Sequence, residues 1–129
     1  SNSVGNLLVH LAGNVRQWVV HGLGGVPDER RRAAEFARRS GLGPEEAFGI
    51  LMESVRAADR VLEGLDPAVL DRPLRIQGVE TSGLRALYHV VEHFSMHTGQ
   101  ILYIAKLRTG RDLELYDVDE NGKVRGTRW

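Results

Sequence analysis

The stretch His89-Val-Val-Glu-His93-Phe-Ser-Met-His97-Thr-Gly-Gln100 places three of the chain's five histidines at intervals of four residues. On a helix this spacing aligns the imidazoles in one stripe. Two imidazoles four residues apart can bind one metal ion, as they do in the helical H-E-x-x-H motif. Spacing alone does not distinguish the pair His89/His93 from the pair His93/His97. The stretch therefore predicts a long helix that carries part of a metal site.

A second interpretation of the stripe is a polar network without a metal, because a histidine on the inner face of a helix is commonly a hydrogen-bonded core residue. The apolar neighbours argue for burial: Val90, Val91, Phe94, Ile101 and Leu102. Three stacked imidazoles in a core would bury several polar groups that each need a partner. A single ion would satisfy them, since neutral imidazole suits Zn, Ni, Cu and Fe.

A further ligand is expected from the beginning of the chain, where His10 interrupts the apolar run Leu7-Leu8-Val9-His10-Leu11. Taken alone, His10 is more often a core histidine with a hydrogen-bond partner. If the first helix packs beside the last, His10 points at the stripe, and one ion satisfies all of these nitrogens. His21 lies at the glycine-rich end of the first helix and is expected to interact with that helix terminus instead.

Apolar residues at helical spacing predict a mainly α fold, most simply an antiparallel helical bundle in one domain spanning residues 1–129. The predicted helices run from Val4 to His21, from Pro44 to about Gly64, and from a cap at Thr81 or Ser82 to Gly110. Residues 66–79 are predicted as a loop in which 74–76 are briefly extended. The tail is predicted to be irregular or a hairpin, with its turn at residues 119–122.

The charged segment Asp28–Arg39 contains five arginines and three acidic residues. It is either a short surface helix or a crossover connection. Its arginines could bind an anionic ligand, but the pattern favours a solvated face.

Composition excludes several classes of function. The 17 basic and 17 acidic residues give no net charge, which argues against a nucleic-acid binder. Without cysteine, the chain has no disulfide, no Cys-based zinc site and no thiolate nucleophile of its own. No apolar run approaches the roughly 18 residues that span a bilayer, and no signal peptide opens the chain. We therefore expect a soluble, cytoplasmic protein without membrane partners.

The pattern His-x-x-x-His93-x-x-x-His97-x-Gly-Gln, together with the upstream pair His10-Leu11, resembles the DinB-like family of metal-binding helical bundles. The resemblance covers essentially the whole chain. It implies that His10, His93 and His97 hold a divalent ion, most simply Zn or Ni, with Fe or Mn as alternatives. It also implies that His89 is not a ligand but helps to orient a neighbouring one.

Two features depart from the family pattern. Thr98 stands where the family usually has Arg or Lys between the last histidine and glycine. The family's bundle also has a helix before the His10 helix, for which this chain has no residues. Three long helices around an incompletely covered apolar groove would then be expected to self-associate, for example as a homodimer.

Three protein ligands leave a coordination position for water or substrate, the arrangement typical of catalytic sites. Nearby polar residues that could assist are Glu92, as a general base, and Asn14, Gln100 and Tyr88. The resemblance implies a metal-dependent transferase that uses a low-molecular-weight thiol, or a hydrolase. The alternative is a metal-binding or stress-response interaction module without turnover.

Overall fold

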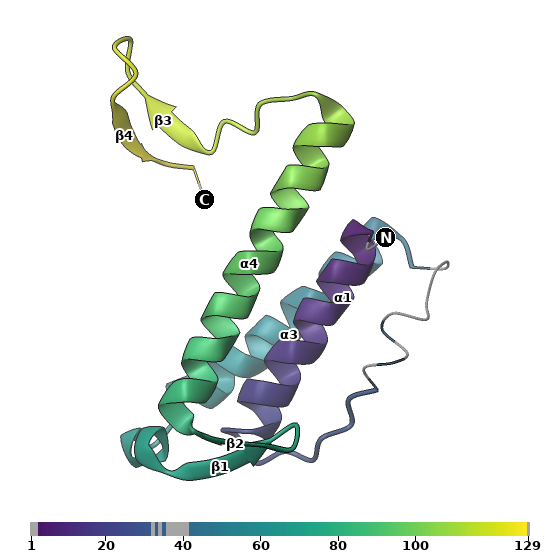
Figure 1. Ribbon diagram of the computed structural model, residues 1–129, viewed down its shortest axis with the longest axis vertical. Helices are drawn as coiled ribbons and strands as arrows, with labels where there is room; N and C mark the ends of the chain where they lie inside the picture. The colour runs from purple at the N-terminus through teal and green to yellow at the C-terminus, as the bar shows by residue number, and fades with distance from the viewer. Residues whose placement is uncertain (1–2, 32, 34, 36–41, 129) are drawn as a thin grey trace.

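The computed structural model describes residues 3–31, 33, 35 and 42–128. Their regular elements are helix α1 (Val4–Val15), the π-helix η1 (Arg16–His21) that continues it, helix α3 (Pro44–Glu63), the 3-10 helix η2 (Pro67–Asp71), strands β1 (Pro73–Ile76) and β2 (Val79–Ser82), helix α4 (Gly83–Thr109), and strands β3 (Tyr116–Val118) and β4 (Val124–Thr127) (Figure 1). The three predicted long helices are confirmed.

Helix boundaries follow from local chemistry. The Ser3 hydroxyl accepts a hydrogen bond from the Asn6 backbone N–H and caps α1, and the Ser82 hydroxyl does the same for α4 through Arg85. Pro44 occupies the first turn of α3, where its missing N–H costs nothing. Helix α4 ends at Gly110, whose φ of 63° is the left-handed conformation that glycine adopts without strain.

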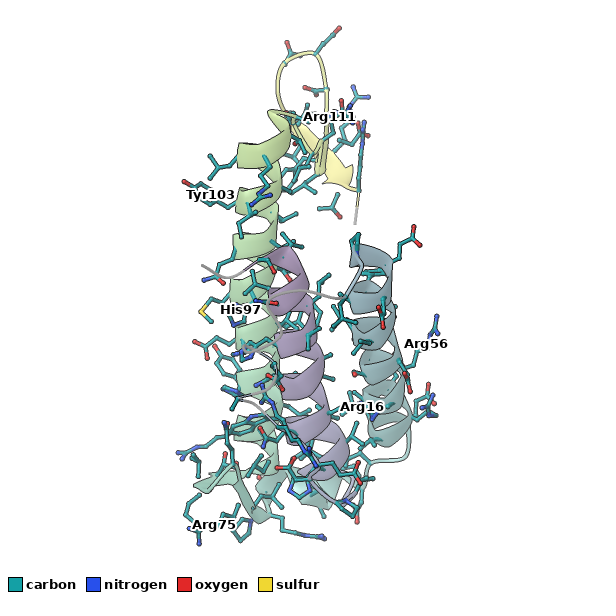
Figure 2. The ribbon with its side chains drawn as sticks, turned by 90° about the vertical axis from the view of Figure 1, so that its right-hand side faces the viewer. Arg16, Arg56, Arg75, His97, Tyr103 and Arg111 are labelled. Carbon is teal, nitrogen blue, oxygen red and sulfur yellow. The ribbon has the colours of Figure 1, made fainter. Side chains whose placement is uncertain are left out.

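Helix α1 lies between α3 and α4 (Figure 2). It runs parallel to α3, because Arg16 contacts Glu53 near the middle of α3 whereas Gly24 approaches Val61 near its end. It runs antiparallel to α4, because His10 contacts His93 while Trp18, further along the chain, contacts the earlier residue His89. Of the two neighbours of α1, only α4 therefore has the antiparallel direction that was predicted for the bundle.

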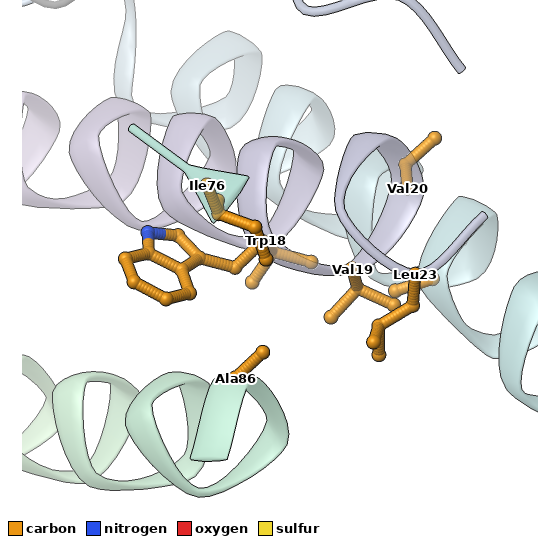
Figure 3. Packing of buried hydrophobic residues seen from close by; sticks show 8 residues of the cluster. Trp18, Val19, Val20, Leu23, Ile76 and Ala86 are labelled. Carbon is orange, nitrogen blue, oxygen red and sulfur yellow. The ribbon is translucent and has the colours of Figure 1, made fainter. Parts of the chain in front are cut away.

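The larger apolar core lies where the π-helix η1 meets β1 and the beginning of α4. Its buried members include Trp18, Val19, Ile76 and Ala86 (Figure 3). Phe94 is partly buried and packs against them. A smaller cluster of Leu11, Ala12 and Leu51 joins α1 to α3. Together the two clusters fix α1 against both neighbouring helices, and hence the height of His10 relative to α4.

Two antiparallel hairpins correct the all-α prediction. Strand β1 pairs with β2, in the segment predicted as a loop, and β3 pairs with β4 in the tail. The second hairpin agrees with the predicted turn at residues 119–122. It lies beyond the end of α4, away from α1 and α3 (Figure 1).

Several large apolar side chains of α4 are exposed: Leu84, Tyr88, Val91, Met96, Tyr103 and Leu107. Helix α4 therefore carries exposed apolar side chains, while the groove left by a missing helix and the self-association both stay predictions. Among the described residues, no helix combines the length and hydrophobicity needed to cross a membrane.

Candidate metal centre

Three histidines converge at the interface of α1 and α4. His10 projects from α1, and His93 and His97 lie one turn apart on α4. Each offers a ring nitrogen, and these nitrogens lie within 4.8 Å of one another. The Nε2 atoms of His10 and His93 are 3.1 Å apart. We call these three residues the three-His cluster; the sequence predicted their convergence, and the packing of α1 on α4 produces it.

Hydrogen bonds at the outer ring nitrogens orient two members of the three-His cluster. Nδ1 of His10 lies 3.2 Å from Oε2 of Glu35, and Nδ1 of His97 lies 2.7 Å from Oε1 of Gln100. Both partners are acceptors, so each Nδ1 carries the proton and each Nε2 keeps its lone pair. This is the tautomer that a metal-bound histidine needs, with its other nitrogen held by an acceptor.

Burial keeps the rings of His93 and His10 neutral. It lowers the pKa of His93 to about 4, helped by the neighbouring rings of His97 and His10. Burial also lowers the pKa of His10, although the hydrogen bond to Glu35 opposes the shift. Neutral imidazole is the form that binds divalent transition metals. The donor set of the three-His cluster therefore fits such an ion.

One polar atom of the cluster lacks a protein partner. Nδ1 of His93 is buried and has no hydrogen-bond partner among the described residues. Its Nε2 faces His10, whose Nδ1 is already engaged by Glu35. The two neutral rings therefore share one hydrogen bond between their facing Nε2 atoms. The Nδ1 atom of His93 stays buried without a hydrogen-bond partner among the described residues, which is uncommon for a polar atom.

His89 has a different environment from the other two stripe histidines. Its Nε2 lies 3.2 Å from Nδ2 of Asn14, and its ring packs on Trp18 at a centroid distance of 4.1 Å. Its ring centroid is 5.5 Å from that of His93. Burial lowers the pKa of His89 as well. The structure thus separates His89 from the three-His cluster and places it beside His93.

The other candidate residues divide into two groups. Asn14 and Gln100 hold histidine rings through the hydrogen bonds described above. Glu92 and Tyr88 are exposed on α4, Tyr88 with 73% of its surface accessible. Neither exposed residue has a described contact with the three-His cluster, so the structure gives no support to Glu92 as a general base or to Tyr88 as an assisting group.

Beside the three-His cluster lies a buried ion pair that the sequence pattern did not indicate. Arg30 and Glu35 belong to the charged segment 28–39 that was predicted to be a solvated face, yet their side chains are only 5% and 10% exposed. That prediction is wrong for these two residues, because Arg30 and Glu35 satisfy each other and contact His10. Arg31 is exposed, as predicted, and Arg32, Arg38 and Arg39 lie outside the described residues.

Beyond the ion pair lies a cavity of about 690 Å³. It is bounded by α1, the segment 26–31 and α3, and its lining includes Gly13, Gln17, Arg31 and Ser54. Arg30 and Glu35 line it too, so the pair borders both the cavity and His10. A small molecule in this cavity would be separated from His10 by the ion pair.

Comparison with known proteins agrees with the geometry. The family model of the DinB superfamily matches residues 1–101. No curated protein and no solved structure matched the chain significantly. The chain belongs to the DinB superfamily, and the matched region contains the complete three-His cluster together with Arg30 and Glu35.

Proposed function

For this member of the DinB superfamily, we propose a metal-dependent enzyme in which His10, His93 and His97 hold a divalent ion. One observation carries the proposal: three ring nitrogens converge while hydrogen bonds hold the outer nitrogens of His10 and His97. Zinc and nickel suit these ligands best, and iron or manganese are alternatives.

Catalysis would use the coordination positions that three protein ligands leave open. A divalent ion in such a site lowers the pKa of a bound water or thiol and so supplies a nucleophile near neutral pH. The chain has no cysteine, so a thiol would come from a small cosubstrate. We therefore propose a thiol-dependent transferase, in keeping with the family resemblance, and a hydrolase as the variant that uses water.

The deep burial of two ligands favours a second candidate function. Only 5% of His10 and 9% of His97 is exposed, and a sealed site is typical of a structural metal rather than a catalytic one. A metal-binding module without turnover is therefore the alternative proposal. The two functions differ in whether a small molecule reaches the ion.

A turnover screen tests the choice. Zinc- and nickel-loaded protein is incubated with several small thiols and electrophiles, and separately with ester and amide substrates. The transferase proposal expects thiol-dependent product that disappears in His97→Ala. His89→Gln is the comparison: because His89 lies beside His93 but outside the three-His cluster, this variant should lower turnover less than His97→Ala. Stoichiometric metal without turnover in either arm would favour the non-catalytic module.

A further inference from the structure

The Arg30–Glu35 ion pair makes a two-point contact. Nε of Arg30 donates to Oε1 of Glu35 at 2.8 Å, and Nη2 donates to Oε2 at 2.9 Å. Nη1 of Arg30 donates to Oε1 of Gln17 at 2.8 Å, which ties the pair to η1. Nη2 also lies 3.4 Å from Nδ1 of His10, but its shorter contact is with the carboxylate. The guanidinium therefore fixes the plane of the carboxylate that contacts His10.

Gly13 lets the pair lie against α1. A Cβ at this position would be 2.2 Å from Oε1 of Glu35 and 2.9 Å from Nε of Arg30. Gly13 is three residues after His10, so it lies on the adjacent part of the same helix face. A glycine inside a helix lowers helix stability, which makes the close approach of the ion pair a physical reason for its presence here.

Stability alone gives little reason for this arrangement. Burying a carboxylate and a guanidinium costs desolvation energy, and apolar residues of similar size often stabilise a core as well or better. What the pair adds is orientation. An acceptor on Nδ1 of a metal-binding histidine fixes its tautomer and ring plane and increases its basicity.

We propose that Glu35, held by Arg30 and seated against Gly13, is a positioning residue for His10 in the metal centre. The inference rests on the proposed metal site and extends it to a segment that carries no ligand. The metal centre then has a third structural component besides α1 and α4, namely the segment that bears the ion pair.

Metal affinity of matched variants tests the inference. Zinc dissociation constants are measured by competition with a chromophoric chelator for the wild type, Glu35→Gln, Gly13→Ala and Gly5→Ala. Gly5 is the control, because it lies in the same helix and has room for a Cβ. The nearest atom to that Cβ would be Ser3 Oγ, at 3.9 Å. We expect zinc binding roughly 10- to 100-fold weaker in Glu35→Gln and Gly13→Ala, and unchanged in Gly5→Ala.

A spectroscopic readout separates positioning from general destabilisation. In zinc-loaded wild type, the His10 Nδ1 proton should give a slowly exchanging, downfield NMR signal, because a buried carboxylate accepts it. The signal should shift in Glu35→Gln and Gly13→Ala, while the far-UV circular dichroism of the protein stays unchanged. Wild-type affinity and an unshifted signal in both variants would overturn the inference and leave the metal site standing. A wild type that binds no ion would overturn the proposed function and this inference together.

Discussion

Acid should destabilise the metal-free protein through His93 before the carboxylates titrate fully. In the folded state, burial lowers the pKa of His93 from 6.5 to about 4. Well above pH 6.5 the ring is neutral in the folded and in the unfolded protein, so its protonation does not affect the free energy of unfolding. As the pH falls, the unfolded chain takes up the proton first, and the free energy of unfolding decreases until the folded state also protonates near pH 4.

The size of this effect follows from the shift. With unfolded and folded pKa values of 6.5 and about 4, the linkage relation gives a loss of about 2 kcal/mol between pH 7 and pH 5. The ring is partly accessible to water, which screens its charge. We therefore expect about 1 to 2 kcal/mol. Burial shifts the pKa of His10 in the same direction and adds to the loss.

Urea unfolding at pH 7 and pH 5 in the presence of a chelator measures the effect. The comparison is with His93→Gln, which keeps a polar side chain of similar size but has no titrating ring. The wild type should lose about 1 to 2 kcal/mol more than the variant over this interval. Subtracting the free-energy loss of the variant from that of the wild type removes the contribution of the carboxylates, which both proteins share. Equal losses in both would refute the reasoning that partial burial keeps the His93 ring neutral in the folded state.

Three further predictions concern packing and metal linkage. Gly83→Ala should lower the free energy of unfolding by about 2 kcal/mol or more, because its Cβ would lie 2.2 Å from the Val69 carbonyl oxygen. In Gly49→Ala, where nothing lies within 4 Å, the same change should raise it by up to about 1 kcal/mol; urea titrations check both. Trp18→Ala should cost roughly 3 to 5 kcal/mol in the same assay, since the indole is 6% exposed within the larger core. Zinc at about 100 times its dissociation constant should stabilise the wild type by about 2.7 kcal/mol, seen as a raised melting temperature, and His97→Ala should abolish this gain.

The sequence could predict the three-His cluster because the signals are local. Repeats of four residues identify the stripe on α4, and an isolated histidine in an apolar run identifies His10. Two further steps were needed. One was the packing of the first helix on the last, and the other was the choice of His93 and His97 over His89 and His93, which came from the resemblance to the DinB-like family and not from the spacing. The cap of α4 was similarly readable as Thr81 or Ser82, because these residues precede a helical apolar pattern, and the structure selects Ser82.

The Arg30–Glu35 pair could not be predicted, because its burial depends on contacts that sequence spacing does not encode. Arg30 and Arg31 are adjacent and chemically identical, yet Arg30 is buried against Gln17 while Arg31 is exposed. One available signal was Gly13, a glycine inside a helix next to a candidate ligand. The reason for this glycine becomes clear only when Arg30 and Glu35 are seen to lie against it.

The β1–β2 hairpin was missed for a different reason. Its turn consists of Gln77 and Gly78, both with positive φ, at 56° and 76°. This conformation suits asparagine or aspartate before glycine, and glutamine is not a typical first residue. The tail hairpin was easier to predict, because Asn121-Gly122 is a strong turn signal.

Metal stoichiometry tests the central claim most directly. Protein purified without a histidine tag is stripped with a chelator, reloaded with zinc, desalted and examined by elemental analysis. We expect one ion per chain in the wild type and in His89→Gln, and loss of that ion in His93→Ala and His97→Ala. Substoichiometric metal that is unaffected by the His93→Ala and His97→Ala substitutions would contradict the assignment of the three-His cluster as a metal centre.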